Sequence, residues 1–187
     1  GYGWYDTQRD IDFLPTPTRA VGEQEIGFFS VHARLAHVTE REHWYLRPQI
    51  DAGVTHVNLE DFREQGAGGA NLDVRGHEET YVSLQPAVEV GQEIERPDGT
   101  LVRPWAKLGI THFLSGPTPQ ITAVFQGAPA GVAPFSVTGD VDETFADVSL
   151  GLDVLKEDGI NFRFNYTGQF SEDMKNHGVG LKITIPF

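Results

Sequence analysis

The residues of this chain that could carry chemistry are its seven histidines and a few serines and carboxylates. No histidine belongs to an HExxH pattern or has the spacing to carboxylates that a metal site needs. Ser30, His32 and Asp51 have the side chains of a hydrolase triad, but no nucleophile elbow surrounds any serine. The glycine-rich run 66–70 lacks the lysine and following helix of a phosphate-binding loop, so we expect an exposed loop tip there. The sequence therefore predicts no catalytic residue, no metal, no cofactor and no enzyme activity.

Charge and length limit the class of protein. The 187 residues contain 27 acidic and 14 basic side chains, a net charge of −13, which argues against a nucleic-acid partner. The absence of cysteine fits a protein that crosses an oxidising compartment without disulfides. No apolar run reaches the roughly 20 residues of a membrane-spanning helix. A β-barrel escapes this test, because its lipid-facing and lumen-facing residues alternate.

The last nine residues alternate between apolar and other side chains without an error. A period of two puts one set on a single face of an extended strand: Val179, Leu181, Ile183, Ile185 and Phe187. Soluble chains rarely end on so apolar a strand, because chain ends usually fray. This ending is instead typical of transmembrane β-barrels of the bacterial outer membrane, which the C-terminus resembles.

The same alternation recurs about eight times along the chain. The segments are 1–9, 29–37, 46–54, 82–91, 106–111, 148–154, 160–170 and 179–187. Strands of about 9–11 residues cross a bilayer when tilted. We find no helix pattern, so the predicted fold is all-β, an antiparallel transmembrane barrel with about eight strands in this chain.

The predicted connections alternate in length. Long polar connections are expected at 10–25, 60–78 and 115–140, and short ones at 39–43, 95–100 and 156–159. The short connection 95–100 contains the turn pair Asp98-Gly99. Long loops at one end and tight turns at the other are typical of outer-membrane barrels. A soluble ligand-binding barrel can share this asymmetry, but its apolar side chains point inward.

The polar face mixes small and neutral side chains with charges of both signs. This blend suits a hydrated, closed lumen with ion pairs better than a freely solvated surface. We therefore expect the charged members to face the lumen: Arg34, Arg47, Asp51, Glu89, Lys107, Asp147, Arg163 and Lys182, with Asp153 beside them.

Three strand openings share a proline. They are the segments 45–53, 84–91 and 102–109, with Pro48, Pro86 and Pro104. Proline removes a donor from a sheet, so we expect local bulges there. Together with the opening 1–9 and the closing 164–187, these segments resemble the autotransporter β-domain, the translocator of type V secretion. The resemblance extends over nearly the whole chain.

This resemblance implies a barrel in the bacterial outer membrane that anchors an N-terminal passenger and helps to export it to the cell surface. Barrels of this family usually have twelve strands and a helix through the pore. Residues 1–187 would then be the C-terminal portion of the domain, from the fifth strand to the twelfth. The implied partners are outer-membrane lipid, the covalently attached passenger upstream and the barrel-assembly machinery. That machinery would read an assembly signal formed by Phe187, Ile185 and Ile183.

Two alternatives remain open at this point. The chain could be a small, complete eight-stranded outer-membrane barrel that serves as an anchor or adhesin. It could also be a soluble β-barrel whose apolar side chains enclose a hydrophobic ligand.

Overall fold

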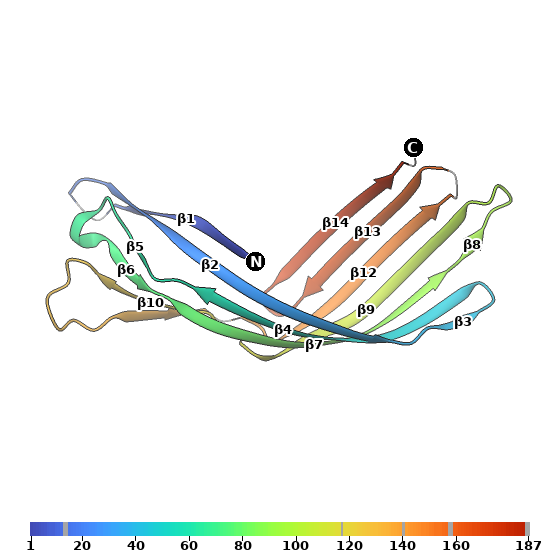
Figure 1. Ribbon diagram of the computed structural model, residues 1–187, viewed down its shortest axis with the longest axis horizontal. Coiled ribbons are helices and arrows are strands. Elements are labelled where there is room, and N and C mark those ends of the chain that lie inside the picture. The colour runs from blue at the N-terminus through green and yellow to red at the C-terminus, as the bar shows by residue number, and fades with distance from the viewer. Residues whose placement is uncertain (13–14, 117, 140, 157–158, 186–187) are drawn as a thin grey trace. The chain divides into compact units, whose positions relative to one another are not determined.

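The computed structural model describes residues 1–12, 15–116, 118–139, 141–156 and 159–185. Eight antiparallel strands are hydrogen-bonded in chain order (Figure 1). They are β1 (Tyr2–Ile11), β2 (Thr18–Ala36), β4 (Trp44–Leu59), β7 (His77–Gln92), β9 (Leu101–Ser115), β12 (Thr144–Leu155), β13 (Asn161–Phe170) and β14 (Lys175–Thr184). The predicted eight strands and the all-β class are confirmed. No helix in the described residues is long and apolar enough to cross a membrane.

Two of the short connections carry small strands. β3 (Thr39–Arg41) pairs with β4, and β8 (Ile94–Glu95) pairs with β9. The turn after β8 places Gly99 at a φ of 77°, which favours glycine. The third short connection includes residues 157 and 158, which lie outside the described residues.

The long connections contain more structure than the sequence predicts. A second sheet joins β11 (Phe135–Thr138), β10 (Gln120–Phe125), β6 (Leu72–Arg75) and β5 (Phe62–Arg63) in that order, and a single 3-10 turn, η1, covers Gly68–Ala70. The loop predicted at 10–25 is wrong, because β1 and β2 stay paired as far as Ile11 and Thr18. The charged side chains of these strand ends can point into water. The sequence of such a strand is as polar as that of a loop, so hydropathy does not distinguish the two.

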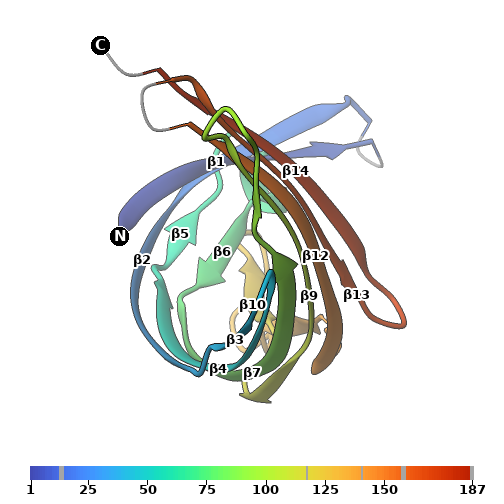
Figure 2. The same ribbon diagram turned by 90° about the vertical axis from the view of Figure 1, so that its right-hand side faces the viewer.

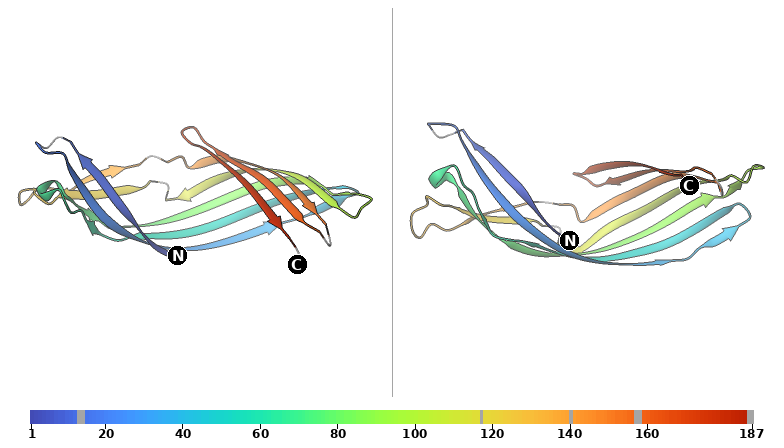
Figure 3. Two further views of the ribbon diagram at one scale, coloured as in Figure 1. Left: turned by 90° about the horizontal axis from the view of Figure 1, so that it is seen from above. Right: turned by 45° about the horizontal axis from the view of Figure 1, so that its top comes forward.

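The strands divide between two compact units. The first contains residues 1–31, 54–82 and 115–141, and the second contains 32–53, 83–114 and 142–187. In the second unit β12, β13 and β14 run side by side (Figure 2). In the first unit β1 lies along β2 (Figure 3).

One of the predicted proline bulges is not found where the register is known. β9 and β12 pair from Leu101 opposite Leu155 to His112 opposite Thr144 in one continuous register. Pro104 lies opposite Leu152 within it. The bulge expected at Pro104 is therefore absent on the β12 side.

Burial is inverted relative to a soluble protein. Among the described residues, few hydrophobic side chains are buried: Ile11, Ala20, Val74, Ala87, Ala123 and Phe145. Large ones on the strands are open, with Leu108 at 64% exposure and Val179 at 73%. Polar residues Glu89 and Asp153 are only 5% exposed. This pattern does not favour a soluble barrel that encloses a hydrophobic ligand.

Glycines on the strands make room for aromatic rings. A Cβ atom added at Gly151 would overlap the indole ring of Trp105, which is directly opposite on β9. A Cβ atom at Gly91 would lie 2.5 Å from the ring of Tyr45. Both rings have the parity of the polar face, so aromatic and glycine residues pack together there.

Candidate functional site: the polar face of the strands

The first cluster on the polar face joins β2 to β4. Arg34 on β2 donates from Nε to Oδ1 of Asp51 at 2.6 Å and from Nη2 to Oδ2 at 3.0 Å. Gln49 donates a longer hydrogen bond of 3.4 Å to the same carboxylate. A two-point arginine–carboxylate contact of this kind is directional as well as electrostatic. It connects side chains of neighbouring strands on one face.

The second cluster joins β4 to β7 and is more deeply buried. Arg47 donates to Oε2 of Glu89 at 2.6 Å, and the hydroxyl of Tyr45 donates to Oε1 at 2.8 Å. Both oxygens of the nearly buried Glu89 thus have a donor. A buried carboxylate needs such partners, because losing the water around it is costly.

The third cluster surrounds Asp147 on β12 with neutral donors. Its carboxylate accepts hydrogen bonds from Thr111 at 2.5 Å and from Gln85 and Gln169 at 3.0 Å each. Asp147, Gln85 and Gln169 border a recess of about 320 Å³ that Lys107 also lines. Asp147 has no arginine or lysine within ion-pair distance among the described residues.

A fourth cluster lies where β12 and β13 approach their short connection. Nε of Arg163 is 2.9 Å from Oδ1 of Asp153, the residue directly opposite. Lys182 lines a smaller recess of about 120 Å³ next to Arg163. Within the described part of the chain, neither Lys182 nor Lys107 forms an ion pair.

The structure therefore brings most of the predicted polar-face residues into contacts with one another or with neighbours on the same face. Reasoning from charge overlooked their neutral partners, which are Tyr45, Gln49, Gln85, Thr111 and Gln169. A signal for them existed in the sequence. Each has the odd parity of the charged residue beside it on its own strand.

The side chains of the hypothetical triad serve other contacts. Ser30 hydrogen-bonds Oγ1 of Thr55 at 2.9 Å, and Asp51 is held by Arg34. Among the described residues, no group of three or more histidines and carboxylates is placed to hold a metal ion.

The apolar side chains of the C-terminal segment are exposed. Ile183 is 51% exposed and Ile185 is 62% exposed. Ile183 lies opposite Phe162 of β13, so it continues the apolar face of that strand. Phe187, the last member of the predicted assembly signal, lies outside the described residues.

The comparisons with known proteins give one positive result. A family model of the autotransporter beta-domain matches residues 1–167 of this chain. No curated protein matches. The matched range includes β1 to β12 and most of β13.

Proposed function

The chain belongs to the autotransporter β-domain family, whose members are outer-membrane translocator barrels that export an attached passenger, and from this premise we propose a role for each face of its strands. The apolar face contacts outer-membrane lipid. The polar face lines the lumen, with Arg34, Arg47, Asp51, Glu89 and the other charged residues described above. The role of the domain is translocation and anchoring rather than catalysis.

The inverted burial of the second unit carries this proposal. Polar side chains such as Glu89, Asp153 and Gln49 are 5–7% exposed, whereas apolar side chains on the opposite parity are 40–73% exposed, among them Leu152, Leu150 and Val179. In water such a surface would be an extensive apolar patch, which soluble monomers avoid. In lipid it becomes the natural outer surface of a barrel.

The ion pairs of the polar face support a hydrated lumen. Arg34, Arg47 and Arg163 each have a carboxylate partner on the neighbouring strand. Pairing across strands neutralises the charges locally and holds the side chains against the wall. A passenger segment passing through would then meet mainly small and neutral groups.

We also propose that residues 1–187 form the C-terminal portion of a larger barrel. The support is the edge of β2. From Phe29 to Ala36, this strand has β4 as its only strand neighbour among the described residues, because β1 pairs only with the stretch 18–27. Unpaired backbone groups in hydrocarbon cost several kcal/mol each. Amide exchange is expected to slow at 29–36 when the full-length protein is compared with this segment alone, and unchanged exchange would contradict the proposal.

The apolar C-terminal strand is proposed to be the signal that the barrel-assembly machinery reads. Replacing Phe187 by Ser should reduce display of the passenger on cells that make the full-length protein. The matched control is Thr184→Ser, at a position of the opposite parity in the C-terminal sequence. Barrels refolded in detergent should keep their heat-modifiable gel mobility in both variants, because the signal acts during assembly.

Two results would count against this assignment. Display of Phe187→Ser at parental level and rate would remove the assembly role from this residue. If Phe187→Ser lost its heat-modifiable mobility in detergent to the same extent as it lost surface display, Phe187 would stabilise the folded barrel rather than direct its assembly.

A further inference from the structure

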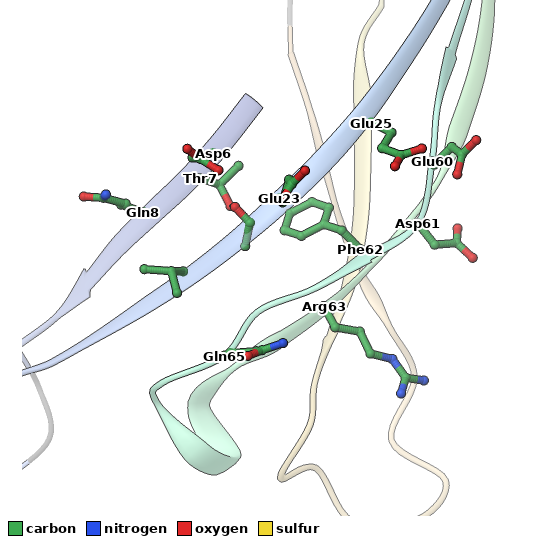
Figure 4. A pocket seen from close by; sticks show the side chains of 12 residues that line it. Asp6, Thr7, Gln8, Glu23, Glu25, Glu60, Asp61, Phe62, Arg63 and Gln65 are labelled. Carbon is green, nitrogen blue, oxygen red and sulfur yellow. The ribbon is translucent and has the colours of Figure 1, made fainter. Parts of the chain in front are cut away.

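The four-stranded sheet of the first unit has one covered edge and one open edge. At the β5 edge, the ring of Phe62 would be 2.8 Å from a Cβ atom added at Gly22 of β2. Figure 4 shows this ring turned toward the β2 ribbon while Arg63 points away from it. The Gln65 amide also donates to the Val21 carbonyl of β2 at 2.8 Å. The β5 edge is therefore already occupied within this unit.

The opposite edge of the sheet is β11. Among the described residues its only strand neighbour is β10, and all four of its residues are exposed. Sheet edges usually carry charged side chains or prolines, which prevent pairing with another strand. The strand β11 contains neither. Its outer edge is therefore open to a further strand.

The hairpin of β10 and β11 is tied to the other long connection. The Gln126 amide donates to the carbonyl of Asn71 at 2.9 Å, and the Gly127 amide donates to the carbonyl of Gly69 at 2.9 Å. A Cβ atom at Gly127 would lie only 2.8 Å from Cα of Gly69, so the two backbones touch where neither has a side chain. The edge is thus preformed, which lowers the entropy lost when a partner binds.

The register shows which backbone groups of β11 point away from β10. The Gly139 amide donates to the Pro119 carbonyl at 2.8 Å, so these residues are a hydrogen-bonded pair of the ladder. Such pairs alternate along antiparallel strands, so Val137 also directs its backbone groups to β10. Ser136 and Thr138 then direct their amides and carbonyls to the open edge.

The apolar face of this sheet reaches the open edge. At its centre Ala123 is 1% exposed and Val74 is 8% exposed. Toward β11 the same face is open, with Val137 at 58% and Ile121, directly opposite on β10, at 57%. Phe135 lies opposite Ala123 and is 42% exposed. A strand added at this edge would therefore cover apolar side chains as well as backbone groups.

The charge of the hairpin indicates what that strand is. Residues 116–139 contain no acidic, basic or histidine side chain, in a chain whose net charge is −13. Two copies of so acidic a chain repel each other where their charged surfaces meet. Along this hairpin they can approach without that repulsion. A charged partner would gain nothing from this surface, whereas a second copy offers the same neutral, apolar edge.

We propose that β11 is a contact between two copies of this chain, in which the two β11 strands pair antiparallel about a two-fold axis at Val137. Ser136 of each copy then lies opposite Thr138 of the other, and their free backbone groups form about four hydrogen bonds. The two Val137 residues become a non-hydrogen-bonded pair with Cα atoms about 4.5 Å apart. Both copies use the same surface, as a closed two-fold interface requires.

This contact is weak. Its hydrogen bonds are fewer than the roughly ten of a standard interface. The edge therefore supports a transient pair of barrels in one membrane rather than an obligate dimer. The inference goes beyond translocation and does not depend on which face of the strands lines the lumen.

The pairing is tested by disulfide formation between identical single cysteines in a chain that has none of its own. Val137→Cys places the two thiols opposite each other, within the Cα separation of about 4.4–6.8 Å that a disulfide needs. The matched control is Ile121→Cys, equally exposed on the same face but one strand farther from the edge. Its two copies would be three strand spacings, about 14 Å, apart. The full-length protein, free of other cysteines, is oxidised with copper phenanthroline in isolated outer membranes and analysed on a non-reducing gel.

A further variant, Ser136→Pro added to Val137→Cys, removes the contact but keeps the hairpin. Its ring replaces an amide that points away from β10 and obstructs an approaching strand, and sheet edges tolerate proline at such positions. Passenger display and heat-modifiable gel mobility should be unchanged, which checks that the barrel is intact.

The proposal requires a dimer band for Val137→Cys that is at least about tenfold stronger than that for Ile121→Cys. Equal bands at the two positions would indicate random collisions and overturn the pairing. So would a dimer band that persists with Ser136→Pro, or the absence of a band from a Val137→Cys thiol that a maleimide labels fully. A cross-linked band that is not twice the monomer mass would give the edge to another occupant. The contrast between the two cysteine positions decides the proposal even if Ser136→Pro lowers display, and none of these results alters the proposed roles of the strand faces.

Discussion

Replacing Leu150 by Arg tests the assignment of the apolar face by its energetic cost. Leu150 is 47% exposed on β12 and lies between Ala106 and Tyr166 of the neighbouring strands. It is five residues from Leu155, or about 17 Å along the strand at about 3.3 Å per residue. A strand tilted by about 45° then places it about 12 Å deep, near the middle of an apolar band about 25 Å tall.

An arginine at this depth should lower the free energy of unfolding by about 2–4 kcal/mol. The folding equilibrium would shift by about 30- to 900-fold. The assay is urea unfolding of the complete β-domain refolded in phosphatidylcholine vesicles, followed by tryptophan fluorescence and extrapolated linearly to water.

The matched control is Thr167→Arg. Thr167 is exposed, lies opposite Ser149 and borders the recess that contains Asp147. An arginine there stays in a polar environment, so its effect should remain within about 0.5 kcal/mol. If Thr167→Arg costs several kcal/mol and Leu150→Arg costs almost nothing, the two faces have been assigned the wrong way round.

Three further perturbations have defined outcomes. Gly151→Ala should lower the free energy of unfolding by about 1–3 kcal/mol, because its methyl group overlaps the ring of Trp105. The same change in a Trp105→Leu background should be nearly neutral in the urea assay. Equal costs in the two backgrounds would contradict the steric explanation. Hydrogen bonds from the amide and hydroxyl of Thr100 lower the pKa of Asp98 below its ordinary value. Its ionised form therefore stabilises the turn above about pH 3.9, and this contribution is lost as the pH falls through the pKa of the folded state. When the free energy of unfolding is measured against pH, Asp98→Asn should lack the decrease at acidic pH that this carboxylate causes. Glu89→Gln leaves a partly buried arginine without its counter-charge and should lower the free energy of unfolding by about 1–3 kcal/mol, whereas a neutral result would show that the pair is not needed for stability.

The period of two predicted the strands and their two faces well, because that alternation is a local property of the chain. The ends of β12, β13 and β14 lie within a few residues of the predicted segments. Strand length in the first half was underestimated. Glu23 and Glu25 on β2 are polar on the outward parity, and a strand that extends into water has no hydropathy signal to separate it from a loop.

The contacts between the two long connections 60–76 and 118–139 could not be predicted from the sequence. Glu64 lies 55 residues from Arg9, and Gln126 lies 62 residues from Glu64. Such pairs depend on how two connections meet in space, and no periodicity encodes that meeting. The glycine-rich run was expected to be an exposed tip, and Gly66, Gly68 and Gly69 are indeed exposed. Its contact with Gly127 was missed because it requires two glycines from distant segments.

The most direct test of the central claim is a spin-label scan of β12 from Val148 to Asp153 in the full-length protein in lipid vesicles. Collisions with oxygen, which dissolves in lipid, should peak at Val148, Leu150 and Leu152. Collisions with a water-soluble nickel complex should peak at the alternate positions Ser149 and Asp153; Gly151 is left unlabelled because a side chain there would overlap the ring of Trp105. Labels at the apolar positions that are shielded from both reagents would contradict the account, because that result describes a protein core rather than a lipid-facing surface.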